Sequence, residues 1–445
     1  MARNAAQAQT ILRATHRATI RAMLAACGDT AYMAAPMVNA SEQAFRLLAR
    51  RHNTHICFTP MLHSRLMVES EGYRRNAMHD LGDAADAPLI VQFCGNDPDT
   101  LLRAGRHVEA HCAAVDINLG CPQGIARKGN YGAFLLEKTS LLERIVLNLS
   151  GNLAVPVTCK IRLLSTLDAT LDLARRLEKA GCAMLTVHGR TKEEMKDRIG
   201  MVDWEAIKLI REAVKIPVIA NGGLATFDDV AKCVAATGVA GVMSSEALLE
   251  NPAFFNPERN AAPAVPAAES AEAESAEAAD DAFLGESSKK RPRIEAGGSS
   301  ETSNASGSSS GTGTGALVGG AGAGACPCPW TARQFVLARE YCEIASTNPP
   351  KYFKVVKAHM IKYLFSAFMA DKKSIQRHFE ARSMEDMIEN LASVEMNATT
   401  AGHPVHTALA AEPFPVNGPG PWYARHGERK GATKRGSKRA RASKP

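Results

Sequence analysis

The sequence lacks the features that mark membrane-spanning and disulfide-rich proteins. No stretch of about 18 uncharged apolar residues occurs, which excludes a membrane span. The eleven cysteines are scattered, and no secretory signal opens the chain. Aromatic residues make up only 5% of the chain, whereas hydrophobic residues reach 45% and charged residues 22%. This composition predicts an intracellular protein with a sizeable core and reduced thiols.

Acidic residues are also scarce at the two ends of the chain. No acid precedes Asp29, and Arg13, Arg17 and Arg21 recur every four residues. On a helix these arginines would form one basic stripe, as in an organelle transit peptide. We nevertheless expect residues 1–30 to be a flexible extension. Residues 421–445 contain nine Lys or Arg against one Glu, so this tail carries +8 and the other 420 residues carry −1. A basic tail favours a nucleic acid as partner, the alternative being a merely solubilising tail.

Composition divides the rest of the chain into four zones. Residues 31–257 are predicted to form the catalytic domain, 330–395 a small helical domain and 396–445 a flexible basic tail. Residues 258–329 are acidic and then Ser/Gly-rich, which predicts a disordered insert. This insert contains the basic run Lys289–Arg293, a candidate nuclear import signal. Its pair Cys326 and Cys328 lacks a second ligand pair, so we expect no metal site.

The catalytic domain is predicted to be a (β/α)₈ barrel, an α/β fold. Short apolar runs alternate with helical patterns over roughly 230 residues, the size and rhythm of this fold. A doubly wound sheet would normally open with a Gly-rich turn, whereas here the first run ends at Pro36-Met37. The predicted strands are Ala31–Met37, His55–Pro60, Leu89–Phe93, Val115–Leu119, Val157–Ile161, Met184–His188, Val218–Ala220 and Gly241–Ser244.

Polar residues gather where these strands end, which is where barrel enzymes place their active sites. Alternation along each strand predicts that they share the inner face. Gly222 and Gly223 follow the seventh strand, and loops there commonly bind phosphate. Together with Lys160 and Gln92 they suggest a flavin mononucleotide, because lysine stabilises a reduced flavin ring and glutamine offers both a donor and an acceptor.

The helical domain is predicted to contact phosphates. Phe353, Val356, Met360, Leu364 and Phe368 fall on one helical face, while Lys351, Lys354 and Lys362 lie largely opposite. A solvated face of a small bundle is the alternative interpretation, and the two are compatible.

Several motifs resemble those of the tRNA-dihydrouridine synthases, in order over residues 31–255 and again over 330–395. The most specific is Asn118-Leu119-Gly120-Cys121-Pro122, followed by Tyr131-Gly132-Ala133-Phe134-Leu135. The details are most similar to the eukaryotic class that modifies tRNA positions 16 and 17. Others are Ala35-Pro36-Met37-Val38, Val91-Gln92-Phe93, Lys160-Ile161-Arg162, Val187-His188-Gly189-Arg190 and Asn221-Gly222-Gly223.

The resemblance implies an FMN-dependent reduction of the uracil C5–C6 double bond in the tRNA D loop. NADPH or NADH would reduce FMN, the flavin would pass a hydride to C6, and Cys121 would give a proton to C5. Asn118 and Arg162 would line the substrate side, and the C-terminal helices with Lys351 and Lys354 would bind tRNA. The residues that would contact FMN are Pro36, Met37, Val38, Gln92, Lys160, His188, Asn221, Gly222, Gly223, Ser245 and Glu246. Ser245 and Glu246 depart from the Gly-Arg pair of the bacterial enzymes.

Two other functions remain open from the sequence. An FMN barrel could reduce a small pyrimidine, which would leave the basic helices and tail without a role. A barrel without catalysis could serve as an RNA-binding scaffold, although Cys121 and Lys160 argue against this. We expect a monomer in the cytoplasm, the nucleus or both, with organelle targeting by the N-terminal arginines as the alternative.

Overall fold

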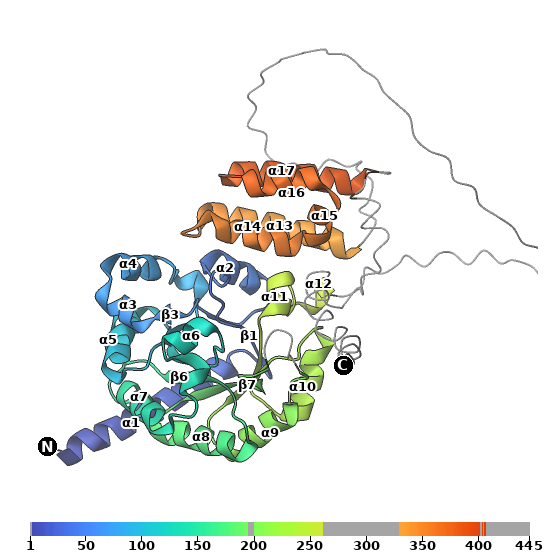
Figure 1. Cartoon of the computed structure of the whole chain (residues 1–445). Helices are drawn as coiled ribbons and strands as arrows, with labels where there is room; N and C mark the ends of the chain where they lie inside the picture. The colour runs from blue at the N-terminus through green and yellow to red at the C-terminus, as the bar shows by residue number, and fades with distance from the viewer. Residues whose placement is uncertain (1, 195–199, 261–328, 401–402, 404, 406–445) are drawn as a thin grey trace, which may run out of the picture. The chain divides into compact units, whose positions relative to one another are not determined.

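The computed structural model describes residues 2–194, 200–260, 329–400, 403 and 405, and its central feature is a closed parallel barrel (Figure 1). β1 pairs with β2 and β9, and a pairing between β2 and β4 closes the ring of eight strands. The two-residue β3 only extends the pairing of β4. The predicted (β/α)₈ barrel is therefore confirmed. The strands are β1 Ala31–Ala34, β2 Ile56–Phe58, β3 Leu62–His63, β4 Leu89–Cys94, β5 Ala114–Leu119, β6 Val157–Leu163, β7 Met184–Thr191, β8 Val218–Asn221 and β9 Gly241–Ser244.

Helices surround the barrel and occupy the connections between its strands. Several of them begin with an N-cap residue whose side chain accepts a hydrogen bond from a backbone N–H of the first turn. The pairs are Asp97 with Thr100, Thr166 with Ala169 and Asp203 with Ala206. The helices are α2 Gln43–Arg51, α3 Ser64–Glu69, α4 Glu71–His79, α5 Pro98–Val108, α6 Gly124–Lys128, α7 Thr139–Ser150, α8 Leu167–Ala180, α9 Trp204–Ala213, α10 Asp228–Thr237, α11 Glu246–Glu250 and α12 Pro257–Asn260. Three 3₁₀ turns join them: η1 Ala84–Asp86, η2 Glu109–His111 and η3 Gly132–Leu135.

The barrel interior is apolar at one end and polar at the other. Near the start of the strands, Met33, Phe58, Ile90 and Met184 are fully buried in one cluster. Toward the carboxyl ends the inward positions become polar, and strand pairing sets them side by side. The polar pairs in register are Gln92 with Asp116, Asp116 with Thr158, Asn118 with Lys160, Lys160 with Thr186, Arg162 with His188 and His188 with Asn221. The apolar end therefore contributes the packed core of the barrel, and the polar end gathers the side chains that can take part in chemistry.

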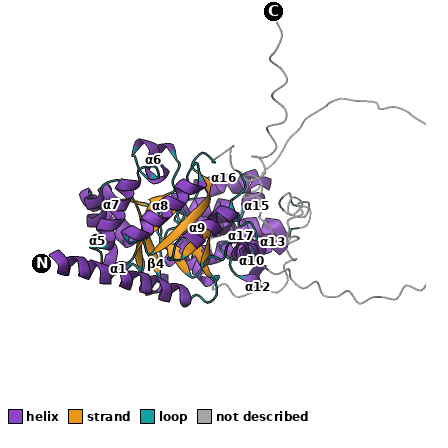
Figure 2. Ribbon diagram, turned by 90° about the horizontal axis from the view of Figure 1, so that it is seen from below, coloured by secondary structure: helices purple, strands orange, loops and turns teal. Residues whose placement is uncertain are grey.

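The N-terminal segment is a helix packed on the barrel, which corrects the expectation that residues 1–30 form a flexible extension. Helix α1 (Ala2–Ala25) buries Ile20 and Leu24 in the apolar cluster at the start of the strands. In Figure 2 it lies beneath the strands, opposite α6. The arginine stripe also faces the barrel, since Arg17 donates to the carbonyl oxygen of Glu178 at 2.8 Å and Arg13 to Ser150 Oγ at 3.1 Å. Packing therefore accounts for the four-residue spacing.

The C-terminal segment forms five helices that share a core. The helices are α13 Pro329–Thr347, α14 Phe353–Tyr363, α15 Phe365–Ala370, α16 Lys372–Glu380 and α17 Met384–Thr399. The predicted continuous helix breaks at Leu364, yet Val356, Met360 and Phe368 are buried as expected. Lys351 and Lys354 are exposed, but Lys362 is only half-exposed and lies near Glu42 of the barrel. The expectation of a solvated face therefore fails for Lys362.

The boundaries of the helical segment differ slightly from the prediction, and parts of the chain lie outside the described residues. Helix α13 begins at Pro329 and α17 ends at Thr399, so the helical segment begins one residue earlier and ends four residues later than predicted. The described parts of 1–263 and 324–445 belong to one compact unit. Most of the predicted insert, including Lys289–Arg293, and most of the basic tail lie outside the described residues. In the described part of the chain, no helix is long and apolar enough to cross a membrane.

Candidate active site

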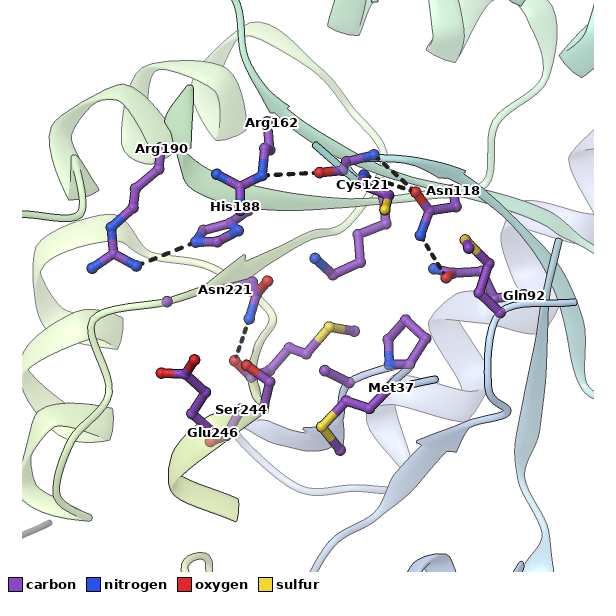
Figure 3. A pocket seen from close by; sticks show the side chains of 18 of the residues that line it. Met37, Gln92, Asn118, Cys121, Arg162, His188, Arg190, Asn221, Ser244 and Glu246 are labelled. Carbon is purple, nitrogen blue, oxygen red and sulfur yellow. Dashed lines mark hydrogen bonds between the residues drawn. The ribbon is translucent and has the colours of Figure 1, made fainter. Parts of the chain in front are cut away.

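A cavity of about 570 Å³ opens at the carboxyl ends of the barrel strands (Figure 3). Its volume lies within the range of pockets that hold small molecules and cofactors, roughly 300–1,000 Å³. It brings together every residue that the sequence predicted for catalysis, for cofactor contact and for the substrate side of the barrel. These are Pro36, Met37, Val38, Gln92, Asn118, Cys121, Lys160, Arg162, His188, Asn221, Gly222, Gly223, Ser245 and Glu246.

A chain of hydrogen bonds runs from the barrel interior to Cys121. Thr158 Oγ1 and Gln92 Nε2 donate to the two carboxylate oxygens of Asp116 at 2.7 and 2.8 Å. Asn118 Nδ2 donates to Gln92 Oε1 at 2.7 Å, and Asn118 Oδ1 accepts the backbone N–H of Cys121 at 3.0 Å. Burial raises the pKa of Asp116 to about 6, against the hydrogen bonds from Thr158 and Gln92. The chain therefore fixes both the amide of Gln92 and the position of Cys121.

Among the described residues, this chain of hydrogen bonds leaves Gln92 with one donor and one acceptor unused. A primary amide has two N–H groups and a carbonyl oxygen with two lone pairs. Asp116 takes one N–H and Asn118 takes one lone pair. Gln92 is fully buried and lines the cavity. It can therefore present a donor and an acceptor edge together, as a flavin ring requires. Asn118 itself is committed to the Cys121 loop, and its contact with substrate stays a prediction.

Lys160 is a cation at the wall of the cavity. Among the described residues, none forms a hydrogen bond or an ion pair with its ammonium group. Burial lowers the pKa of Lys160 to about 8, helped by the positive charge of Arg162 and opposed by Asp116. A partly desolvated ammonium without a partner indicates an anionic or electron-rich ligand.

His188 lies in a cationic corner of the cavity beside Arg162 and Arg190. Burial, and then the charges of Lys160, Arg162 and Arg190, hold the pKa of His188 far below its usual value, so the ring is neutral. Arg190 Nη1 donates to His188 Nε2 at 3.4 Å, which leaves the proton on Nδ1. Arg162 Nε donates to the carbonyl oxygen of Gly120 at 2.9 Å, next to Cys121. Burial lowers the pKa of Arg162 to about 10, and it remains charged at neutral pH.

The two glycines after β8 shape another wall of the cavity. Gly222 and Gly223 have φ angles of +97° and +77°, a region that side chains rarely adopt. A Cβ on Gly222 would come within 3.1 Å of the His188 ring, and one on Gly223 within 3.2 Å of Trp204. Asn221 Nδ2 donates to the carbonyl oxygen of Met243 at 2.9 Å and ties β8 to β9. The neighbouring side chains therefore leave no room for a side chain at either position, and the two glycines line the cavity without one.

Some functional candidates were missed and some lie elsewhere. Arg190 and Glu194 line the cavity, and Asp116 holds Gln92, yet none was predicted as a site residue. Alternation along the strand already predicts that Asp116 shares the inner face with Asn118, but no sequence signal assigns it the role of holding Gln92. Lys351 and Lys354 do not line the cavity; both approach the ring of Tyr352 at the start of α14, with Nζ at 4.8 and 5.0 Å from its centroid.

The site offers no metal-binding cluster. In the described part of the chain, no group of three or more His, Cys, Asp or Glu side chains could hold a metal ion. The pair Cys326 and Cys328 lies outside the described residues.

Comparisons with known proteins agree with this geometry. Residues 33–284 match the family model described as dihydrouridine synthase. The chain belongs to the dihydrouridine synthase family. Among curated members, it is 50% identical over 230 residues to the "tRNA-dihydrouridine(16/17) synthase [NAD(P)(+)]-like" protein of Rattus norvegicus, covering 52% of each chain. It is 45% identical over 225 residues to the 16/17 synthase of Schizosaccharomyces pombe, covering 50% of this chain and 56% of that one.

A second dihydrouridine synthase class is less similar. The "tRNA-dihydrouridine(20a/20b) synthase [NAD(P)+]-like" protein of Homo sapiens is 38% identical over 231 residues, covering 51% of this chain and 71% of that one. The chain is thus more similar to the synthases named for positions 16 and 17. It matches about half the length of the two 16/17 synthases.

Proposed function

We propose that the protein is a flavin-dependent tRNA-dihydrouridine synthase that reduces uridines at positions 16 and 17 of the tRNA D loop. The cofactor would be FMN and the reductant NADPH or NADH. The observation that carries the proposal is the pairing of Cys121 and Lys160 in one cavity. Cys121 is held at its loop by Asn118, and Lys160 faces the same space without a partner among the described residues.

The donor set of the cavity fits FMN. The backbone around Gly222 and Gly223 would hold the phosphate, and Gln92 would meet both edges of the ring with its free donor and acceptor. Lys160 would stabilise negative charge on the ring. When bound there, FMN would supply hydride chemistry, with NAD(P)H as the source of the hydride and C6 of uracil as its acceptor.

The chain's own residues would then complete the reduction. The Cys121 thiol gives its proton to C5 and becomes a thiolate, which regains a proton from solvent before the next turnover. Arg162, whose Nε donates to the Gly120 carbonyl oxygen, lies beside this loop and would hold the polar edge of the uracil.

Recognition of tRNA would fall to the helical segment and the basic tail. A uracil must leave its stack to reach the cavity, which costs a few kcal/mol. Binding of the folded tRNA by these segments would offset this cost. Lys351 and Lys354 are exposed at the start of α14 and available to phosphates.

One experiment tests the proposal directly. The purified protein is incubated with FMN, NADPH and an unmodified tRNA transcript, and dihydrouridine is mapped by mass spectrometry. A reaction without NADPH and one with free uridine in place of tRNA serve as controls. Dihydrouridine confined to positions 16 and 17 is expected. Reduction of free uridine with no product on tRNA would instead indicate a small-molecule pyrimidine reductase.

A further inference from the structure

A second cavity, of about 400 Å³, opens beside the loop that carries Cys121. It is formed by residues at or just beyond the ends of β3, β4 and β5, so it lies at the same end of the barrel as the active-site cavity. The two cavities share no lining residue. The wall of the second cavity includes His63 of β3, Thr100 of α5, and Lys128 and Tyr131 after β5.

Helix α6 separates the two cavities. Gln123, directly before α6, lines the active-site cavity, and Lys128, the last residue of α6, lines the second cavity. A helix of this length, five residues, measures about 7.5 Å, against about 3.4 Å between stacked bases of one strand. Figure 2 shows α6 standing out from the barrel on the side opposite α1. Two neighbouring bases of an RNA, one in each cavity, would therefore be unstacked.

Ile125 lies on the outer side of α6, between the two cavities. Its side chain is 65% exposed, whereas Ala126 beside it is fully buried. The helix is also anchored, because the Tyr131 backbone N–H donates to the Ala126 carbonyl oxygen and Asn96 Nδ2 to the Asn130 carbonyl oxygen, both at 3.0 Å. Nucleic-acid-binding proteins use apolar side chains on rigid elements as wedges that unstack neighbouring bases. Ile125 has the placement and chemistry of such a wedge.

The charges of the second cavity leave one cation available. Of its two acids, Asp97 caps α5 and Glu69 Oε2 lies 3.8 Å from Arg65 Nε. Within the part of the chain that the structure describes, the ammonium group of Lys128 has no hydrogen-bond or ion-pair partner. Lys128 is exposed at the end of α6 and can meet the phosphate that joins two nucleotides.

The rest of the lining fits a neutral base. The rings of His63 and Tyr131 lie edge to face, with their centroids 5.7 Å apart. Burial lowers the pKa of His63, so its ring is neutral and offers one donor and one acceptor. Thr100 adds a hydroxyl group. Aromatic walls with a few neutral polar groups are typical of sites for splayed-out RNA bases.

We propose that the second cavity binds the base next to the uridine that is being reduced, with Ile125 of α6 as the wedge between the two. The inference rests on the proposed function in so far as it takes tRNA as the substrate. Positions 16 and 17 are neighbours, so each uridine could occupy the second cavity while the other is in the active-site cavity. One enzyme would then reach both positions.

Single-turnover reduction tests the second cavity with a tRNA transcript that lacks the base at position 16 but keeps its sugar and phosphates. Uridine 17 should be reduced about tenfold more slowly in this transcript than in the intact one, the effect of one lost base contact. Thr100→Phe, which fills the cavity and keeps the N–H that caps α5, should cause a similar loss on intact tRNA. On the transcript without base 16 it should have no further effect. Thr100→Ser is the matched control and should behave as wild type.

Fluorescence of 2-aminopurine at position 16 tests the wedge without turnover. This base fluoresces more strongly when it is unstacked, so its fluorescence should rise when the wild-type protein binds the tRNA. The rise should be smaller in Ile125→Ala and kept in Ile125→Leu. Leu147→Ala, which truncates a 47% exposed side chain of α7, is the control.

Four results would overturn the inference. They are equal reduction rates with and without base 16, a Thr100→Phe loss that persists without that base, no change in 2-aminopurine fluorescence on binding, and slower reduction of the flavin by NADPH in Thr100→Phe. The last would assign the second cavity to the adenine end of the reductant. A wild-type protein that forms no dihydrouridine would contradict the proposed function, and the fluorescence would still decide whether base 16 is unstacked.

Discussion

The imidazole of His359 lies against the buried carboxylate of Glu42, with Nε2 at 3.1 Å from Oε1. Tyr341 Oη also donates to Oε1 at 2.8 Å, and Tyr363 Oη lies 3.4 Å from His359 Nδ1. Glu42 immediately precedes α2, one residue after Ser41, whose Oγ accepts the backbone N–H of Met37 at the cavity wall. The cluster therefore ties the C-terminal helices to the loop that shapes the cavity.

Replacing Glu42 by Gln should lower the free energy of unfolding by about 3 kcal/mol, because the buried carboxylate that Tyr341 and His359 contact is lost. Burial favours the neutral acid, but His359 and the hydrogen bonds from His359 and Tyr341 outweigh it and lower the pKa of Glu42. The contribution is therefore complete above the ordinary pKa of 4.5 and is lost as the pH falls through the lowered value.

Urea unfolding across a pH series checks this prediction. The difference between wild type and Glu42→Gln should be constant near neutral pH and shrink in acid. The control is Glu71→Gln, which removes an exposed partner of Arg75 on α4 and should cost no more than about 0.5 kcal/mol. A difference that does not change with pH would contradict an ionised Glu42 in the folded state.

Cys121→Ala should keep the flavin and lose most of the reduction of tRNA. In the proposed mechanism the thiol donates the proton, and the loop that carries it is fixed through backbone N–H groups that alanine retains. A loss of about 10²- to 10⁴-fold in turnover is expected for removal of a general acid. Reduction of bound flavin by NADPH should be unchanged, and Cys27→Ala, on the far side of the barrel, is the control. Unchanged turnover would remove Cys121 from the mechanism.

The affinity for FMN should fall as the pH rises through about 8. Burial, helped by the charge of Arg162, lowers the pKa of Lys160 to about 8, so the ammonium is present below this pH and lost above it. An electron-rich ligand binds the charged form better. Fluorescence titration of FMN from pH 6.5 to 9.5 gives the profile. Lys160→Met should bind weakly with a flat profile over this range, whereas a step near pH 8 that survives in the variant would assign it to another group.

The barrel and its cavity followed from the sequence because both have local signatures. Buried parallel strands have short apolar runs as their sequence pattern. Alternation along these strands predicts that Asn118 and Lys160 lie on the inner face. The two hydrogen bonds by which Asn118 joins Gln92 to Cys121 could not be predicted in this way. It depends on how neighbouring strands stand in register.

The remaining differences come from contacts between residues far apart in the chain. Arg17 bonds Glu178, 161 positions away, so its spacing alone suggested a free basic stripe. Lys362 was placed on the solvent side because helical periodicity gives relative faces only. The face that meets the barrel is chosen by His359 and Glu42, which are 317 positions apart.

Helix α1 should contribute to stability, since it covers the apolar end of the barrel. Ile20 is fully buried there, and Ile20→Ala removes three methyl or methylene carbons from that cluster. We expect a loss of about 3 kcal/mol in the free energy of unfolding. Ile11→Ala on the same helix is the matched control, because Ile11 is 60% exposed and its truncation should cost little. Because alanine is the better helix former, propensity cannot cause a loss, and equal losses at the two positions would contradict packing of Ile20 on the barrel as the source of the cost.

Removing the residues after Gly420 should weaken tRNA binding and flatten its dependence on salt. The segment carries nine Lys or Arg and one Glu. Each phosphate contact of a cation adds about 0.7 to 0.9 to the slope of log affinity against log salt concentration, because bound counterions are released. The slope is measured by fluorescence anisotropy with labelled tRNA between low and moderate salt. A full-length variant with these cations replaced by Gln should match the truncation if charge is the cause. If the slope stays the same in both variants, tRNA binding would be assigned to the helical segment. Lys351 and Lys354 would then be the residues to replace.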